Sequence, residues 1–267
     1  MMIDAMGVPA RYEVYGTEGD QVLLLHGWGP GVITLEAHLA PLAVLLSDAH
    51  RVTALEFPAH GRSGNPTGDW AVADYALWVK DIILQLGIAP VTLVAHSFGG
   101  RIALWLAANE PQLVSRMVLT GCAGIRREST PAERRRQNTY RRCRQWLDRA
   151  ERVRVLQPLA AWAEEALVQR YGSADYRALD PALRGTFIKI VSEDLRPLLS
   201  CISQPVMLVW GERDDATPLW MGQVMAREIA DAALHVMEGR GHYAYLEEPV
   251  RFAAIVRALI REDHKRG

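Results

Sequence analysis

Short apolar runs alternate along most of the chain with longer segments that have the spacing of an amphipathic helix. The segment 74–86 is typical of the helices, because Tyr75, Trp78 and Ile82 recur at intervals of three and four. The apolar runs are too short for helices and predict buried strands at 22–25, 52–57, 91–95, 114–120, 206–210 and 234–237. This alternation predicts an α/β fold, with a mostly parallel sheet covered by helices on both faces.

Two regions modify this pattern. A hairpin of 3–5 and 11–15 around Gly7 is expected to add an antiparallel edge, which makes an eight-stranded sheet. The segment 125–197 is helical by pattern and lacks a convincing strand. We therefore expect a core made of 1–124 and 198–267, with 125–197 as a helical insertion after the sixth strand.

The composition is that of a single globular protein, and it argues against nucleic-acid-binding, membrane-spanning and disulfide-rich proteins. A chain of 267 residues with a net charge of −1 can bury a sizeable core and gives no sign of nucleic-acid binding. No run approaches the ~20 apolar residues of a membrane span, and no leader pattern opens the chain. Three widely spaced cysteines, Cys122, Cys143 and Cys201, favour a reducing compartment. We expect a cytoplasmic protein that has no metal site, since no His, Cys, Asp or Glu group has ligand spacing.

The segment 91–100, VTLVAHSFGG, has the pattern of a nucleophile elbow. A buried strand ends at Ser97, and Gly99 and Gly100 leave room for a tight reversal into a helix. Ser97 would then project from the carboxyl end of the strand. The Phe98 amide would lie at a helix N-terminus, where it can hold developing negative charge. The alternative is that Ser97 is only the N-cap of a buried helix.

A serine nucleophile needs a base, an orienting acid and an oxyanion hole. His242 follows the last strand in a glycine-punctuated loop and is the candidate base. Asp214 follows the strand 206–210 and is the candidate acid, with Asp215 as its competitor. A glycine-rich loop, His26-Gly27-Trp28-Gly29, follows the strand 22–25, and its Trp28 amide would complete the oxyanion hole with that of Phe98.

Together these segments resemble the α/β-hydrolase family over nearly the whole chain. The landmarks are LLLHGWG, EFPAHGRSG, AHSFGG, WGERDDATP and GRGHYAYLEEP, in the family's order of nucleophile, acid and base. The resemblance favours Asp214 over Asp215, because Asp214 lies three residues after Gly211 and four before Pro218. The chain departs from the family with Ala95 where glycine is usual, and with Glu56 and Ala59 where aspartate and glycine are usual. None of these departures removes a catalytic group.

The resemblance implies an esterase of the carboxylesterase type that works through an acyl-enzyme without a cofactor. The segment 125–197 would be its cap, and this cap sets specificity. Trp146 and Trp162, with Leu156, Leu159 and Tyr171, would roof an apolar acyl pocket. The other pocket candidates are His26, Gly27, His96 and Tyr243, the two histidines being either structural or pocket-lining.

The cap also carries the one pronounced charge asymmetry, eleven arginines against four acidic residues between Arg126 and Arg154. A solvated helix face is the expected explanation. Attraction of an anionic substrate or docking on a charged surface are the alternatives.

Three other functions compete with ester hydrolysis. HGWGPG resembles the HGSGPG loop of hydrolases that cleave carbon–carbon bonds in ring-cleavage products, but that subgroup has asparagine and tryptophan where this chain has His96 and Tyr243. Perhydrolase activity can accompany the same triad, whereas a haloalkane dehalogenase would need aspartate at Ser97. A ligand-binding protein with slow turnover is the non-enzymatic alternative. We expect a small-molecule ester substrate, no nucleic-acid or membrane partner, and a monomer or homodimer.

Overall fold

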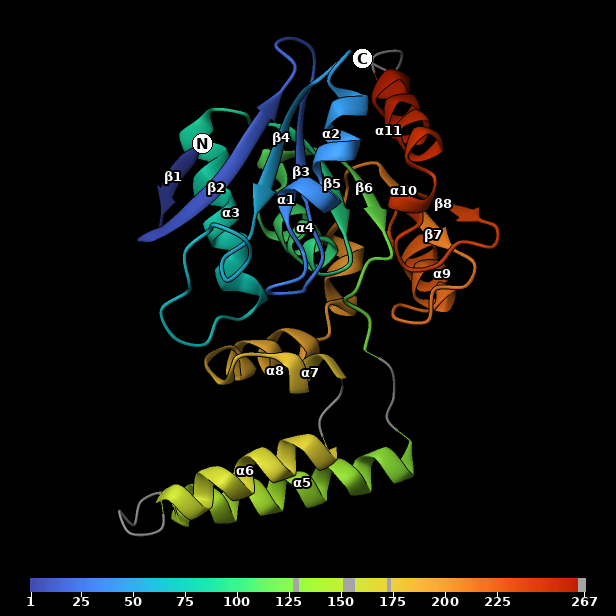
Figure 1. Ribbon diagram of the computed structural model, residues 1–267. Helices are drawn as coiled ribbons and strands as arrows, with labels where there is room; N and C mark the ends of the chain where they lie inside the picture. Colours follow the sequence, from blue (N-terminus) through green and yellow to red (C-terminus); the bar gives the residue numbers. More distant parts are fainter. Residues whose placement is uncertain (127–129, 151–156, 172–173, 264–267) are drawn as a thin grey trace. The chain divides into compact units, whose positions relative to one another are not determined.

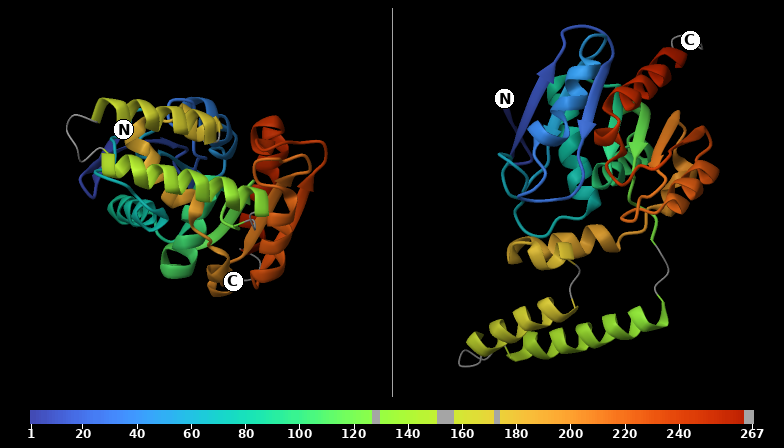
Figure 2. Two further views of the ribbon diagram at one scale, coloured as in Figure 1. Left: turned by 90° about the horizontal axis from the view of Figure 1, so that it is seen from below. Right: turned by 45° about the vertical axis from the view of Figure 1, so that its right-hand side comes forward.

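The computed structural model describes residues 1–126, 130–150, 157–171 and 174–263 of the chain (Figures 1 and 2). The chain divides into two compact units. The first unit contains residues 1–126 and 189–267, and the second contains 127–188. The second unit falls within the segment 125–197 that the sequence marks as an insertion.

An eight-stranded sheet forms the centre of the first unit, in the order β1-β2-β4-β3-β5-β6-β7-β8. The strands are β1 (Met2–Ala5), β2 (Val8–Tyr15), β3 (Gln21–Leu25), β4 (Arg51–Glu56), β5 (Val91–His96), β6 (Val114–Thr120), β7 (Val206–Gly211) and β8 (Ala232–Met237). β2 runs antiparallel to its neighbours β1 and β4. From β4 onwards in this order, every strand is parallel to the next. The predicted mostly parallel sheet, with a hairpin at its edge, is confirmed.

Helices cover both faces of this sheet (Figure 1). One face carries α1 (Leu35–His38), α2 (Ala40–Leu46), α10 (Ala244–Glu247) and α11 (Pro249–Asp263). The opposite face carries α3 (Val72–Leu86), α4 (Phe98–Asn109) and α9 (Leu219–Glu228). Two short 3-10 turns, η1 (Pro111–Leu113) and η3 (Arg196–Cys201), lead into β6 and towards β7.

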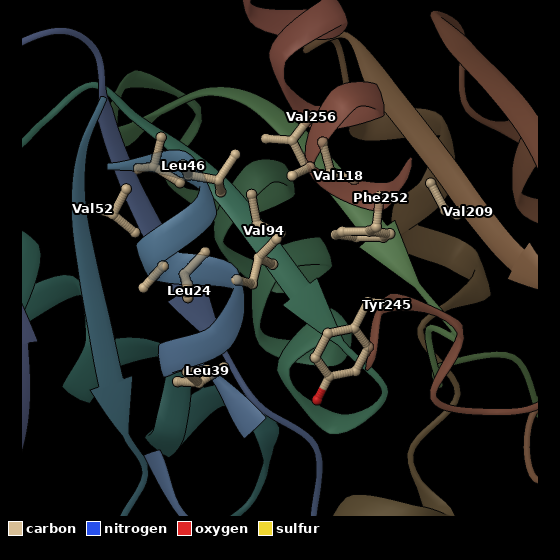
Figure 3. Close-up of a cluster of buried hydrophobic side chains, with 14 of the residues drawn as sticks. Leu24, Leu39, Leu46, Val52, Val94, Val118, Val209, Tyr245, Phe252 and Val256 are labelled. Carbon is tan, nitrogen blue, oxygen red and sulfur yellow. The ribbon is translucent and has the colours of Figure 1, made fainter. Parts of the chain in front are cut away.

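A cluster of buried side chains joins the sheet to the first of these helical layers (Figure 3). Val94 and Val118 from the central strands meet Leu46 of α2 and Phe252 of α11, with Tyr245 of α10 beside them. Each such side chain contributes about 1.5–3 kcal/mol when it is fully buried. This packing holds α10, and with it the loop that precedes α10, against the middle strands.

The second unit is helical in its described residues. It contains α5 (Pro131–Ala150), α6 (Gln157–Tyr171), α7 (Ala174–Ala178), η2 (Pro181–Leu183) and most of α8 (Arg184–Ser192). Arg184 Nη2 donates to Glu165 Oε2 at 3.0 Å, which ties α8 to α6. Arg135 and Arg142 of α5 are exposed, as a solvated helix face would place them.

The two chain segments that connect to this insertion are hydrogen-bonded to each other within the first unit. The Leu195 amide donates to the Gly124 carbonyl at 2.8 Å, and the Arg126 amide donates to Asp194 Oδ1 at 3.3 Å. The outgoing and returning segments therefore meet where the chain leaves the sheet.

Candidate active site

Ser97 lies at a sharp turn between β5 and α4, with φ 50° and ψ −106°. This is an unfavourable conformation for a residue with a side chain, and the surrounding hydrogen bonds hold it there. The Ser97 amide donates to the Thr120 carbonyl at 3.1 Å, and the Ser97 carbonyl accepts from Gly100 and Ala123 at 3.1 Å each. A methyl group at Gly99 would lie 2.6 Å from the Leu25 carbonyl oxygen, so the turn requires glycine there.

Asp214 and His242 form a bonded pair on neighbouring loops. Asp214 follows β7 and is 5% exposed, whereas His242 follows β8 and is only partly buried. His242 Nδ1 lies 3.0 and 2.9 Å from the two Asp214 oxygens. Because a carboxylate accepts, Nδ1 carries the hydrogen and Nε2 keeps its lone pair. That tautomer is the one a general base needs.

Thr217 bonds to Asp214 and is not among the site residues that the sequence predicts. Its amide donates to Asp214 Oδ1 at 2.8 Å, and its hydroxyl lies 2.8 Å from Asp214 Oδ2 and 2.9 Å from the Gly121 carbonyl. Burial alone would raise the pKa of Asp214, but the bonds from His242 and Thr217 outweigh it and lower that pKa. The signal in the sequence is the spacing Asp-x-x-Thr-Pro before a helix, where such local bonds form.

The loop 26–29 after β3 is held by two buried histidines. His60 Nε2 accepts from the Gly29 amide at 3.0 Å, while its Nδ1 donates to the Pro58 carbonyl at 2.9 Å. His26 Nε2 accepts from the Phe57 amide at 2.9 Å, so its Nδ1–H faces the Gly27 carbonyl, 2.7 Å away. Because Nε2 accepts a hydrogen bond in both histidines, each imidazole is neutral and carries its hydrogen on Nδ1.

Gly27 and Trp28 of this loop lie against the turn at Ser97. A methyl group at Gly27 would lie 2.8 Å from His96 Nδ1 and 3.3 Å from Ser97 Cβ, so the close approach depends on glycine. The Trp28 ring packs edge-to-face on the Phe98 ring at 5.4 Å between centroids. The two residues expected to supply the oxyanion amides are therefore neighbours.

Residues 22–255 match the alpha/beta hydrolase family. The chain belongs to this family. A relative in Pseudomonas sp. strain CF600, 2-hydroxymuconate semialdehyde hydrolase, is 29% identical to this alpha/beta hydrolase, over 91% of this chain and 88% of the relative. The solved meta-cleavage product hydrolase of Pseudomonas fluorescens is 26% identical, with a TM-score of 0.72 and coverage of 100% and 98%. An esterase from Exiguobacterium antarcticum, 24% identical over 97% and 98% of the two chains, shares the fold at a TM-score of 0.71.

The departures of this alpha/beta hydrolase at Glu56 and Ala59 have structural consequences. Glu56 is fully buried, and its carboxylate accepts from the amides of Leu35 at 3.1 Å and Arg62 at 2.7 Å. It thereby joins the start of α1 to the loop that carries His60. Ala59 adopts φ 66° in that loop, a conformation that a small side chain tolerates at some cost.

Trp146 and Trp162 belong to the second unit and are each 71% exposed. Their place as the roof of an acyl pocket stays a prediction. Leu156 lies outside the described residues, as do the side chains of Leu159 and Tyr171. Tyr243, by contrast, lies in the first unit beside His242 and His96, with ring centroids 5.3 and 5.0 Å away.

Neither a metal cluster nor a membrane span is found in the part of this alpha/beta hydrolase that the structure describes. No three His, Cys, Asp or Glu side chains there are arranged to hold a metal ion. No helix among the same residues is long and apolar enough to cross a bilayer.

Because several histidines are buried, we predict that the free energy of unfolding falls on mild acidification. Burial lowers the pKa of His60 to about 4 and that of His96 to about 3, from 6.5. Below pH 6.5 the unfolded chain therefore binds protons that the folded chain does not. The free energy of unfolding should fall by about 1.4 kcal/mol per pH unit for each such histidine.

Urea denaturation at about pH 7, 6 and 5 would measure this slope. This range lies above the titration of most carboxylates, so it isolates the histidines. The His60→Gln variant keeps an acceptor for the Gly29 amide and removes one titrating group, so its slope should be smaller. An unchanged slope in that variant would show that His60 is not the source.

Proposed function

We propose that this protein is a serine hydrolase that cleaves carboxylic esters of small to medium acyl groups. The observation that carries the proposal is the Asp214–His242 pair, bonded at 2.9 Å, on loops that follow β7 and β8 of the same parallel sheet whose strand β5 precedes a serine held at φ 50°. A serine N-cap without a catalytic role would require neither the strained turn nor an oriented histidine. The pair therefore favours nucleophilic catalysis over a purely structural serine.

In the proposed mechanism, His242 Nε2 takes the Ser97 proton as Ser97 Oγ attacks the acyl carbonyl. Asp214 stays ionised and stabilises the imidazolium that forms, since its lowered pKa keeps it charged at neutral pH. The Trp28 and Phe98 amides would hold the tetrahedral oxyanion. His242 then gives its proton to the leaving alcohol, and water releases the acid by the same steps.

Carbon–carbon bond hydrolysis is the second candidate, because one relative above is named a 2-hydroxymuconate semialdehyde hydrolase and another a meta-cleavage product hydrolase. The loop 26–31 supports it through its HGWGPG sequence. Against it, His96 and Tyr243 occupy the positions where that subgroup has asparagine and tryptophan. His96 packs against His242, and its Nε2 is bonded to the His242 carbonyl. Ester hydrolysis therefore remains the first choice.

The experiment compares p-nitrophenyl esters from acetate to decanoate with 2-hydroxymuconate semialdehyde as the carbon–carbon substrate. A fluorophosphonate label counts the reactive serine. Ester cleavage with a chain-length optimum supports the proposal and sizes the pocket. Labelling with cleavage of the semialdehyde alone would replace it with the second candidate. Absence of both labelling and turnover would favour a ligand-binding protein.

A further inference from the structure

His96 lies next to Ser97 in the chain and has no part in the proton transfers above. It ends β5, is 3% exposed, and its Nε2 lies 3.1 Å from the His242 carbonyl oxygen. A carbonyl oxygen only accepts, so the hydrogen is on Nε2 and the imidazole donates. Its Nδ1 is buried and has no hydrogen-bond partner among the described residues. His96 is therefore a neutral, one-sided donor between the nucleophile and the base.

The ring of His96 is packed against three other rings and against the backbone of the loop 26–29. Its centroid lies 4.6 Å from the His242 ring, 5.0 Å from that of Tyr243 and 4.9 Å from that of Tyr245. On the Nδ1 edge it faces Gly27, where a methyl group would be only 2.8 Å away. One side chain thus contacts the oxyanion loop, precedes the nucleophile and bonds to the backbone of the base.

The His242 loop is held from its own C-terminal side, where Glu247 Oε1 accepts from the Gly241 amide at 3.0 Å, and from the β7 side. Asp214 bonds to the imidazole, and the Arg213 amide donates to the Arg240 carbonyl at 2.8 Å. The bond from His96 instead connects the loop directly to β5, the strand that precedes Ser97. A misplacement of about 1 Å between reacting groups can cost about 10²-fold in rate. Loss of the connection between β5 and the His242 loop should therefore lower the rate of hydrolysis.

We propose that His96 is a positioning residue that sets His242 relative to Ser97 through its Nε2–H bond to the His242 carbonyl. The inference rests on the proposed ester hydrolysis. The bond matters most where His242 must also protonate the leaving group. An alkoxide needs that proton, whereas p-nitrophenolate leaves without it.

The test uses the matched variants His96→Gln and His96→Met, which have similar lengths. Glutamine keeps an N–H donor near the position of Nε2, and methionine removes it. The substrates are the ethyl and p-nitrophenyl esters of butyric acid, and kcat/KM is compared because it reports acylation. Fluorophosphonate titration counts active sites, and circular dichroism reports folding. If His96→Met does not fold, His96→Phe takes its place.

We expect the methionine variant to lose about 10-fold in kcat/KM on the p-nitrophenyl ester and about 100-fold on the ethyl ester. The glutamine variant should recover most of both. Equal losses on the two esters would overturn the proposal, because a structural defect lowers both alike. A glutamine variant no better than methionine, or parental rates in both, would also overturn it. A parent protein that neither reacts with the label nor cleaves either ester would instead refute the ester hydrolysis itself.

Discussion

The Ser97→Ala variant should retain its fold and lose about 10⁴-fold or more in kcat on the best p-nitrophenyl ester. The bonds that hold the turn come from the Ser97 backbone, to Thr120, Gly100 and Ala123, and alanine keeps all of them. The change removes only the hydroxyl that attacks the carbonyl. Any residual rate would come from the oxyanion amides and substrate binding.

Steady-state kinetics and fluorophosphonate labelling measure this loss, and circular dichroism verifies the fold. Ser200→Ala is the matched control, since Ser200 is exposed in η3. The control should turn over and react with the label like the parent. If folded Ser97→Ala protein cleaved the ester at near the parental rate, Ser97 would not be the nucleophile.

The Asp214→Asn variant should lose about 10⁴-fold in kcat, and Asp215→Asn should change little. Asparagine keeps an oxygen for the Thr217 amide but places an N–H₂ group towards His242 Nδ1. The imidazole then carries its hydrogen on Nε2 and cannot accept the Ser97 proton. Asp215 is exposed, whereas Asp214 is bonded on both carboxylate oxygens.

Kinetics of the two asparagine variants, measured side by side, decide between the adjacent carboxylates. Both changes remove one negative charge from the same loop, so a general electrostatic effect would appear in both. A large loss in the Asp215 variant with an active Asp214 variant would reverse the assignment. Equal and small losses would exclude both residues as the orienting acid.

The sheet could be predicted closely from the sequence because its central strands are buried on both faces. Runs such as 206–210 are apolar throughout, and the observed ends of these strands agree with the predicted ends within two residues. The candidate triad could be found for the same reason. Ser97, Asp214 and His242 each follow a strand of a parallel sheet, and the carboxyl ends of such strands lie along one edge.

The supporting bonds could not be read from the hydrophobic pattern of the sequence. Thr217 bonds to Asp214 because a short loop folds back on itself, and His60 reaches Gly29 from another loop 31 residues away. Such contacts depend on loop backbone geometry, which hydrophobic periodicity does not encode. The sequence marks His96 as either structural or pocket-lining, but its bond to the His242 carbonyl joins positions 146 residues apart.

The hydrogen bonds between the two ends of the inserted segment affect how the sequence of this protein can evolve. The bonds from Leu195 to Gly124 and from Arg126 to Asp194 join the two ends of the inserted segment. Ser97, Asp214 and His242 all lie outside that segment, in the first unit. Insertions whose two ends meet are tolerated well, because replacing them leaves the host chain's path unaltered. We therefore expect the inserted segment to be exchangeable by recombination between related genes, while the stretches that carry Ser97, Asp214 and His242 are inherited intact.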